Sequence, residues 1–160
     1  MNDMFSSDTL TFMTVAYRLV AATLLPLAIG LERYFRNKPI DFRPFVIISL
    51  VACALMIGTA DYLATMQSDG NRMDPTRIME GVITGIGFLG AGAMYRDGDF
   101  IKGAGSAASI WSAGAIGLLC GIGELWLAGI ATGGILVLMI AAEPFAGHWS
   151  NQHDDDEGLS

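Results

Sequence analysis

Apolar residues form long runs in this sequence, and charged residues gather in the short stretches between them. Three runs are uncharged and two carry a single charge; they cover residues 44–60, 103–123, 125–142, 9–31 with Arg18, and 78–95 with Glu80. An apolar run of about 18 to 20 residues is long enough to cross the hydrocarbon core of a bilayer as a helix. The pattern therefore predicts five membrane-spanning helices.

The predicted fold is an all-α, polytopic membrane helix bundle of about five transmembrane helices with small-residue packing faces. We expect an N-terminal tail over residues 1–8, a transmembrane domain over residues 9–143, and a disordered acidic cytoplasmic tail over residues 144–160, because this last segment is too short and polar to bury a core. The connection GIGE, residues 121–124, is short for two full spans. A shorter or re-entrant fourth segment is the alternative there.

Composition agrees with a membrane protein. Of the 160 residues, 52% are hydrophobic and 16% are charged, whereas about 25% of the residues in a soluble domain are charged. The lipid bilayer is thus the first partner expected, and nucleic acid is not expected as one. Cys53 and Cys120 fall inside apolar runs, where a free thiol behaves as a small hydrophobe. The sequence predicts no disulfide, metal site or cofactor.

The basic residues between the predicted helices are distributed unevenly. The connections after the first and third helices contain Arg33, Arg36, Lys38, Arg43, Arg96 and Lys102, whereas the connection after the second contains only Arg72 and Arg77. Connections rich in lysine and arginine tend to stay in the cytoplasm, and acidic residues have little weight in that choice. We therefore expect the N-terminus outside and the C-terminus in the cytoplasm.

The stretch GIGFLGAG, residues 85–92, has the glycine spacing of a dinucleotide-binding loop. Such a loop must follow a buried strand, but here Asp74 suits the N-cap of a helix and Pro75 its first position. The glycines then lie within a helix, where small residues let two backbones approach in a membrane. The predicted packing stripes of this helix contain Gly81, Gly85 and Gly92 on one side and Gly87 on another.

Small residues also recur at helical spacing in the last two predicted helices. In the fourth helix they are Ser106, Ser109, Ala113 and Gly117, and in the fifth they are Gly129 and Gly133. We interpret these stripes as helix packing faces. A polar path lined by the hydroxyls of Thr84, Ser106, Ser109 and Ser112 is the alternative, since hydroxyls can replace part of the hydration shell of an ion.

Charges within or beside the membrane are costly and usually pair with another group or serve a site. Arg18 lies near the middle of the first predicted helix, so we expect it to face the bundle and to bind the carboxylate of Glu80. Other partners considered are Asp61, Asp74 and the carbonyl groups at a helix end. Arg77 lies on the same, outer side.

On the cytoplasmic side we expect the first and third connections to meet. A carboxylate from Glu32 or Asp97 would be held there by Arg33, Arg43 or Lys102, because a guanidinium binds a carboxylate in a fixed geometry. Such a rim of charges would form a docking surface.

Several of these blocks together resemble a known family. The segment YRLVAATLLPLAIGLER at residues 17–33, then Lys38-Pro39, Arg43, DPTRI, GIGFLGAG, Asp97-Gly98, AASIW and AIGL, is similar in order and content to the MgtC/SapB family of bacterial inner-membrane proteins. The resemblance implies about five inner-membrane helices, a role in adaptation to low magnesium or to life in a host, and, for some members, restraint of the F-type ATP synthase.

The sequence departs from that family's pattern in three places. Best-known members carry a folded cytoplasmic domain after the helices, and here the helices are followed by HWSNQHDDDEGLS. The comparison is therefore with a short, SapB-like member. Gly105 and Ser106 stand where threonines are expected, and Glu80 stands where a small residue is more usual.

Two functions from different classes follow. The first is a non-enzymatic modulator of a membrane complex or of ion homeostasis, with the F-type ATP synthase or a second copy of the chain as candidate partners. The alternative is a small magnesium-type cation transporter or channel that uses Glu80, Asp74 and Asp97. An enzyme is not predicted, because no nucleophile stands beside a plausible base and no phosphate loop is present.

Overall fold

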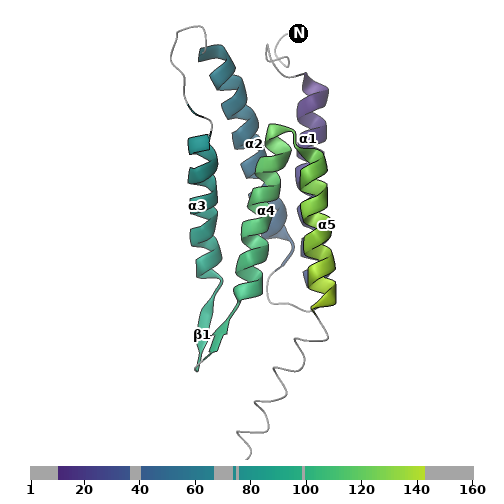
Figure 1. Ribbon diagram of the computed structural model, residues 1–160, viewed down its shortest axis with the longest axis vertical. Helices are drawn as coiled ribbons and strands as arrows, with labels where there is room; N and C mark the ends of the chain where they lie inside the picture. Colours follow the sequence, from purple (N-terminus) through teal and green to yellow (C-terminus); the bar gives the residue numbers. More distant parts are fainter. Residues whose placement is uncertain (1–10, 37–40, 67–73, 75, 99, 143–160) are drawn as a thin grey trace, which may run out of the picture.

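A computed structural model describes residues 11–36, 41–66, 74, 76–98 and 100–142 of the chain. The two predicted tails, the Lys38-Pro39 pair, Arg72 and Pro75 lie outside these residues. The elements run in the order α1 (Phe12–Phe35), α2 (Arg43–Met66), α3 (Thr76–Gly92), β1 (Tyr95–Asp97), β2 (Phe100–Lys102), α4 (Ala104–Ile122) and α5 (Leu125–Ala141). The predicted helix bundle is confirmed (Figure 1).

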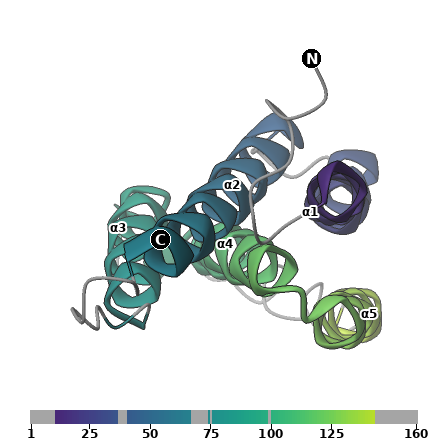
Figure 2. The same cartoon turned by 90° about the horizontal axis from the view of Figure 1, so that it is seen from above.

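Helix α4 lies at the centre of the bundle and packs against all four other helices (Figure 2). Its sequence explains this place, because small residues recur on several of its faces and ten of its residues are buried. Helix α1 packs against α2, α4 and α5, whereas α3 packs mainly against α4 and makes few contacts with α2. Helix α4 is therefore the element that positions the others.

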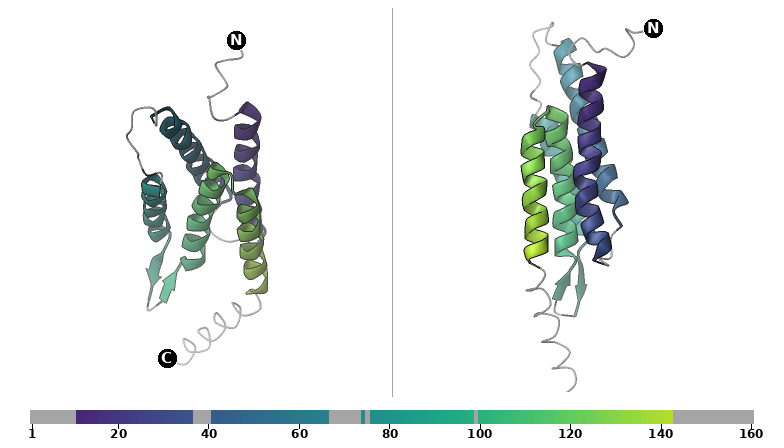
Figure 3. Two further views of the ribbon diagram at one scale, coloured as in Figure 1. Left: turned by 45° about the horizontal axis from the view of Figure 1, so that its top comes forward. Right: turned by 90° about the vertical axis from the view of Figure 1, so that its right-hand side faces the viewer.

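Three of the helices are long and apolar enough to cross a membrane, namely α1, α2 over Arg43–Leu63, and α4. Helix α4 is one continuous helix of 19 residues, long and apolar enough to cross a membrane, which favours a full span over the shorter or re-entrant alternative. Helix α5 is apolar but shorter, with 17 residues. At the α4–α5 turn, the start of α1 and the end of α2 extend beyond the end of α4 and the start of α5 (Figure 3).

The bundle has two distinct ends. We call the end that holds β1 and β2 the hairpin end, and the opposite end, where α4 turns into α5, the turn end (Figure 1). The end of α1 and the starts of α2 and α4 lie at the hairpin end, so Arg33, Arg43, Arg96 and Lys102 share that end. The sequence predicts this grouping of basic residues, because successive helices that cross the bundle in opposite directions place the first and third connections at the same end.

The β-hairpin is a feature that the hydrophobic pattern did not predict. Helix α3 ends at Gly92 instead of continuing to Tyr95, and Tyr95 pairs with Lys102 across two antiparallel strands. The hairpin returns to α4 through Gly103, which has φ of +92° and would place a Cβ atom 2.1 Å from the carbonyl oxygen of Ala93. Only glycine fits there, because other residues are strained at that φ and would clash with backbone.

The apolar core lies between the helices in two main clusters. One joins α1, α2, α4 and α5 through Ile29, Cys53, Ile116 and Ala128, together with three further buried side chains. The other joins α2, α3 and α4 through Phe45, Ile86, Ile110 and Ala113. Both cysteines are fully buried and free, as predicted.

Candidate functional site

Arg33 is a buried charged residue at the hairpin end, with 5% of its surface exposed. It lies in the last turn of α1 and reaches the start of α4, where Nη2 donates to Ser106 Oγ and Nη1 donates to Ser109 Oγ at 3.4 Å. Its Cζ atom lies 5.9 Å from the ring centroid of Phe45 on α2, within the range of a cation–π contact. Arg33 therefore connects three helices.

Glu32 lies beside Arg33 and forms an ion pair with Arg36 one turn further along α1, with 2.5 Å between Glu32 Oε1 and Arg36 Nε. Of the two carboxylates that the prediction offered, Glu32 thus pairs with Arg36 instead of with Arg33, Arg43 or Lys102. Both Glu32 carboxylate oxygens are buried. Helical spacing explains the outcome, because residues i and i+4 are neighbours on one face.

Asp97 forms an ion pair with Lys102 across the β-hairpin, as the sequence predicts. This contact raises the pKa of Lys102 above its ordinary value, chiefly through the hydrogen bond to the Asp97 carboxylate. Both side chains are more than half exposed and lie within one hairpin. The ion pairs of Glu32 and Asp97 therefore do not join the first and third connections, as the predicted rim would require.

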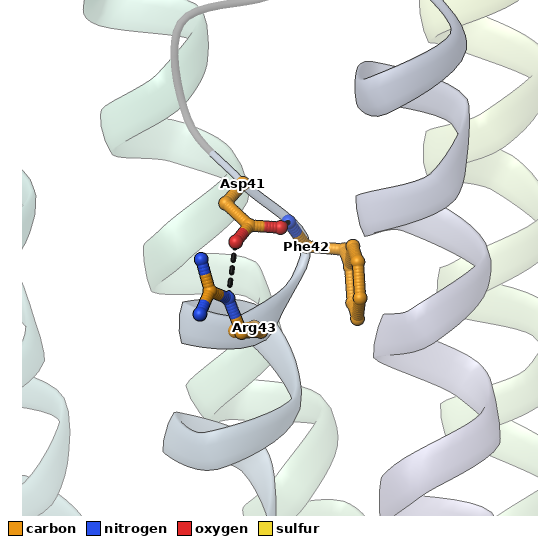
Figure 4. A network of polar contacts seen from close by, with 3 residues as sticks. All are labelled: Asp41, Phe42 and Arg43. Atoms are coloured by element: carbon orange, nitrogen blue, oxygen red, sulfur yellow. Dashed lines mark hydrogen bonds and ion pairs between the residues drawn. The ribbon is translucent and has the colours of Figure 1, made fainter.

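Arg43 binds Asp41, a residue that the sequence analysis did not single out (Figure 4). One Asp41 oxygen accepts the Phe42 N–H at 2.6 Å and the other accepts Arg43 Nε, so the carboxylate caps the start of α2. These bonds, led by the one from Arg43, lower the pKa of Asp41. An aspartate two residues before the start of an apolar helix was the available signal.

Arg18 lies on α1 near the turn end and binds the end of α4. Its Nη1 donates to the carbonyl oxygen of Gly121 at 2.7 Å. The expected pairing with Glu80 is wrong, because Glu80 is exposed on α3 and α3 packs against α4 and α2. The predicted alternative, a helix-end carbonyl, is what the structure contains.

The turn between α4 and α5 explains why Arg18 has a carbonyl to bind. Gly123 has φ of +98°, and the N–H groups of Gly123 and Glu124 donate back to Cys120 and Leu119. This Schellman arrangement satisfies two of the last four carbonyl groups of α4 and leaves Gly121 to another donor. The lack of a Cβ atom at Gly123 also makes room, because that atom would lie 2.7 Å from Arg18 Nη2.

The small residues of α4 form packing faces as predicted. Ser109 and Ala113 are 5% and 0% exposed, and a Cβ atom at Gly117 would lie 2.3 Å from the carbonyl oxygen of Ser49 on α2. Gly121, which the sequence analysis did not name as a packing residue, is also constrained by α2, because a Cβ atom there would lie 2.6 Å from Met56 Cβ and 2.9 Å from the carbonyl oxygen of Cys53. Gly114 meets the flexible end of the Ile86 side chain on α3. The backbones of α2 and α4 therefore meet closely at Gly117 and Gly121.

The glycines of α3 give the opposite result. A Cβ atom added at Gly81, Gly85, Gly87 or Gly92 would meet nothing within 4 Å, so the prediction that these four glycines pack against neighbouring helices of the chain is wrong. The glycine of α3 that does pack is Gly90, whose Cβ atom would lie 3.3 Å from the carbonyl oxygen of Ala107. The faces that carry the other glycines are open because α4 alone contacts α3 extensively.

Asp74 and Arg77 lie at the start of α3, where both are exposed. Asp74 Oδ1 accepts the Thr76 N–H at 2.9 Å, so the predicted N-cap is confirmed, and this bond is the main reason that the pKa of Asp74 is lowered. Both residues line a groove of about 740 Å³ between α2 and α3. A second groove of about 350 Å³ also lies between these helices, lined by Val51 and Leu55 of α2 and by Gly81 and Gly85 of α3.

Comparison with known proteins places these features in a family. A family model described as the MgtC family matches residues 19–148. The chain belongs to the MgtC family. It is therefore a membrane protein of that family, and the resemblance found from the sequence blocks is confirmed. The match includes Glu32, Arg33, α3, α4 and α5 and begins one residue after Arg18.

Relatives of this MgtC-family chain come from several bacteria. An uncharacterized protein of Haemophilus influenzae is 38% identical over 82% of this chain and 56% of its own length. Protein MgtC of Brucella abortus is 32% identical over 79% of this chain and 50% of its own, and protein SapB of Bacillus subtilis is 35% identical over 68% and 48%. The chain thus spans about half the length of these relatives. No solved structure matches it.

Proposed function

We propose that this MgtC-family protein is a non-enzymatic modulator of a membrane complex or of ion homeostasis, acting in the bacterial inner membrane during adaptation to low magnesium or stress. The proposed orientation has the hairpin end in the cytoplasm, which agrees with the basic residues gathered there. The F-type ATP synthase is the candidate partner that the resemblance suggests. The relatives named MgtC support the family membership of this chain, but these relatives are about twice as long as the segment that matches it.

The main support is the closed core between the half-buried Arg18 and the buried Arg33. Arg18 and Arg33 are about 22 Å apart along α1, at about 1.5 Å per residue. The space between them is filled by apolar side chains, and Ile29, Cys53 and Cys120 are all 0% exposed. An ion path needs a continuous polar lining, so this interior favours a modulator over a transporter.

The carboxylates proposed for a transport path do not face this interior. Asp74, Glu80 and Asp97 are all exposed, and Asp97 pairs with Lys102 in the hairpin. The four hydroxyls of the alternative path do not form one lining, because Thr84 is exposed on α3 and Ser112 Oγ donates to Ala108 within α4, whereas Ser106 and Ser109 bind Arg33. In the part of the chain that is described, no three His, Cys, Asp or Glu residues could hold a metal ion.

A partner helix has a suitable surface on α5. Cβ atoms added at Gly129, Gly133 and Gly134 would meet nothing within 4 Å, and Ile130 and Val137 beside them are more than 60% exposed. In lipid, small residues favour association because they let a second helix approach closely. We assign this face to the membrane complex that the protein modulates.

Purified protein in sealed vesicles tests the first half of the proposal. A fluorescent magnesium indicator is trapped inside the vesicles, and an inward magnesium gradient is applied. The indicator signal should rise no faster in vesicles that contain the protein than in protein-free vesicles. An ionophore serves as the positive control. A protein-dependent influx that Glu80→Gln abolishes would overturn the modulator in favour of transport.

Inverted membrane vesicles test the second half. We expect added protein to lower ATP-driven proton pumping by the F-type ATP synthase, and Gly133→Leu to remove this effect while Gly133→Ala retains it. Pumping that stays unchanged at saturating protein would exclude the ATP synthase as the partner. The leucine variant should melt like the parent, because a Cβ atom added at Gly133 meets no atom within 4 Å.

A further inference from the structure

The larger groove between α2 and α3 lies on the outside of the bundle. Helix α3 packs mainly against α4 and makes few contacts with α2, so the space between α2 and α3 stays open. Three of the lining side chains, Val51, Leu55 and Tyr62, are half-exposed. Ligand pockets commonly measure about 300 to 1,000 Å³, and this groove measures about 740 Å³. It is thus large enough for a ligand that arrives through the membrane.

The apolar span of α2 gives the depth of the groove. This span, Arg43–Leu63, contains 21 residues. It is about 31 Å long at about 1.5 Å per residue, which is close to the ~30 Å thickness of the hydrocarbon core. Leu63 therefore lies near the boundary with the headgroups at the turn end. Val51, which lines the other end of the groove, is about 18 Å further in. The groove thus extends over about one leaflet.

The charged residues of α3 lie at the boundary end of the groove. Met79 packs against the buried cluster that contains Met56 of α2, so these two residues are at the same depth. The two helices run in opposite directions (Figure 1). Asp74 and Arg77 precede Met79, and they are therefore level with the part of α2 that follows Met56, toward the headgroups.

The lining of the groove is polar at one end and apolar at the other. Polar side chains line the boundary end, namely Thr59, Tyr62, Asp74 and Arg77. Deeper in the membrane, the groove is lined by Val51, Ala54 and Leu55. A phospholipid has the same gradient, with a charged headgroup above apolar chains. A membrane helix of another protein would instead be apolar along its whole span.

We propose that this groove binds one phospholipid of the leaflet at the turn end, with an acyl chain between α2 and α3, its phosphate at Arg77 and its ammonium group at Asp74. A guanidinium binds phosphate oxygens through parallel hydrogen bonds. Asp74 uses one oxygen to accept the Thr76 N–H. Its negative charge attracts an ammonium group and repels an anionic headgroup that lacks one. The site therefore prefers an ethanolamine headgroup to a glycerol headgroup.

The lipid site is independent of the modulator proposal. It requires only that the chain spans a membrane. It uses α2 and α3, whereas the proposed complex uses α5. Each of the two assignments can therefore fail without the other.

Filling the groove with a side chain tests the site. Purified protein is mixed with phosphatidylethanolamine in detergent micelles, and native mass spectrometry measures the fraction that retains one lipid. Gly58→Phe places a ring in the groove, where an added Cβ atom meets nothing within 4 Å, and it should weaken lipid binding about tenfold. Gly87→Phe is the matched control, because Gly87 is an equally open glycine that does not line this groove. Equal lipid binding by the two variants, or a parent protein that forms dimers and retains no lipid, would overturn the site.

Asp74→Asn tests the headgroup without disturbing the start of α3, because asparagine caps a helix about as well as aspartate. The parent should bind phosphatidylethanolamine about fivefold more tightly than phosphatidylglycerol. Asp74→Asn should remove this preference by strengthening the binding of phosphatidylglycerol, whereas Arg77→Gln should weaken the binding of both lipids. A parent that binds the two lipids equally, or a preference that Asp74→Asn leaves unchanged, would overturn the assignment of the headgroup to Asp74 and Arg77.

Discussion

Replacing Arg18 by leucine tests how the turn end is held together. The guanidinium donates to the carbonyl of Gly121, which the Schellman turn leaves without a partner in the backbone. A hydrogen bond from a charged donor contributes about 1.5 to 3 kcal/mol. We therefore expect Arg18→Leu to lower the free energy of unfolding by about 2 kcal/mol, which corresponds to a roughly 30-fold change in the ratio of folded to unfolded protein.

Two further variants separate this contact from its alternatives. Glu80→Leu should neither destabilise the protein nor rescue Arg18→Leu, because Glu80 is exposed on a helix that α1 does not contact extensively. Gly123→Ala should be destabilising in the parent, since its φ is +98° and the added Cβ atom would lie 2.7 Å from Arg18 Nη2. Part of that cost should disappear when Arg18 is leucine, because the steric component is lost.

Unfolding in mixed micelles, followed by tryptophan fluorescence, measures these effects. Trp126 is a local reporter, because its Nε1 donates to Glu124 at 2.7 Å beside the turn. If Arg18→Leu unfolded at the same denaturant fraction as the parent, the capping role of Arg18 would be wrong. Rescue of that variant by Glu80→Leu would instead support the Arg18–Glu80 ion pair predicted from the sequence.

Four other substitutions probe the remaining contacts. Arg33→Lys should lower the unfolding free energy by about 2 kcal/mol, since an ammonium cannot reach both serines in the geometry of a guanidinium; an unchanged melting temperature in detergent would contradict this. Gly117→Leu should prevent folding, whereas Gly85→Leu should leave the protomer's melting temperature within a few degrees of the parent. The pKa of Asp41 is lower in the folded state than its ordinary value of 3.8. The stability that the Asp41 carboxylate contributes is therefore present above pH 3.8 and is lost as the pH falls through the lower folded-state pKa. Asp41→Asn should remove this pH dependence, measured as hydrogen exchange at the start of α2.

The Arg18 contact shows where sequence reasoning reaches its limit. An arginine within an apolar run must be satisfied inside the bundle, and that much follows from the cost of a charge in lipid. Whether a carboxylate or a carbonyl satisfies it depends on the depth at which α4 turns into α5. That depth is set by helix lengths and packing, and the turn residues Gly121 and Gly123 carry no charge that would mark them as partners.

The glycine stripes show the same limit from another side. Spacing identified small residues on α3 and α4 equally well, and it predicted close packing for both. In the structure Gly117 meets the backbone of α2, whereas Gly85 meets nothing within the chain. A glycine permits close approach, but it does not determine which helix approaches or from which side.

By itself, the sequence determined the five helices, their alternation and the gathering of basic residues at one end, because these depend on the apolar length of each segment and on local charge. Only the tertiary structure decided that α4 is central, that Arg33 binds Ser106 and Ser109, and that the face of α3 stays open. The physical reason is that lipid and apolar side chains are similar solvents for a helix. Hydrophobicity therefore places each helix in the membrane, while the choice of neighbours depends on close packing and hydrogen bonds between residues far apart in the chain.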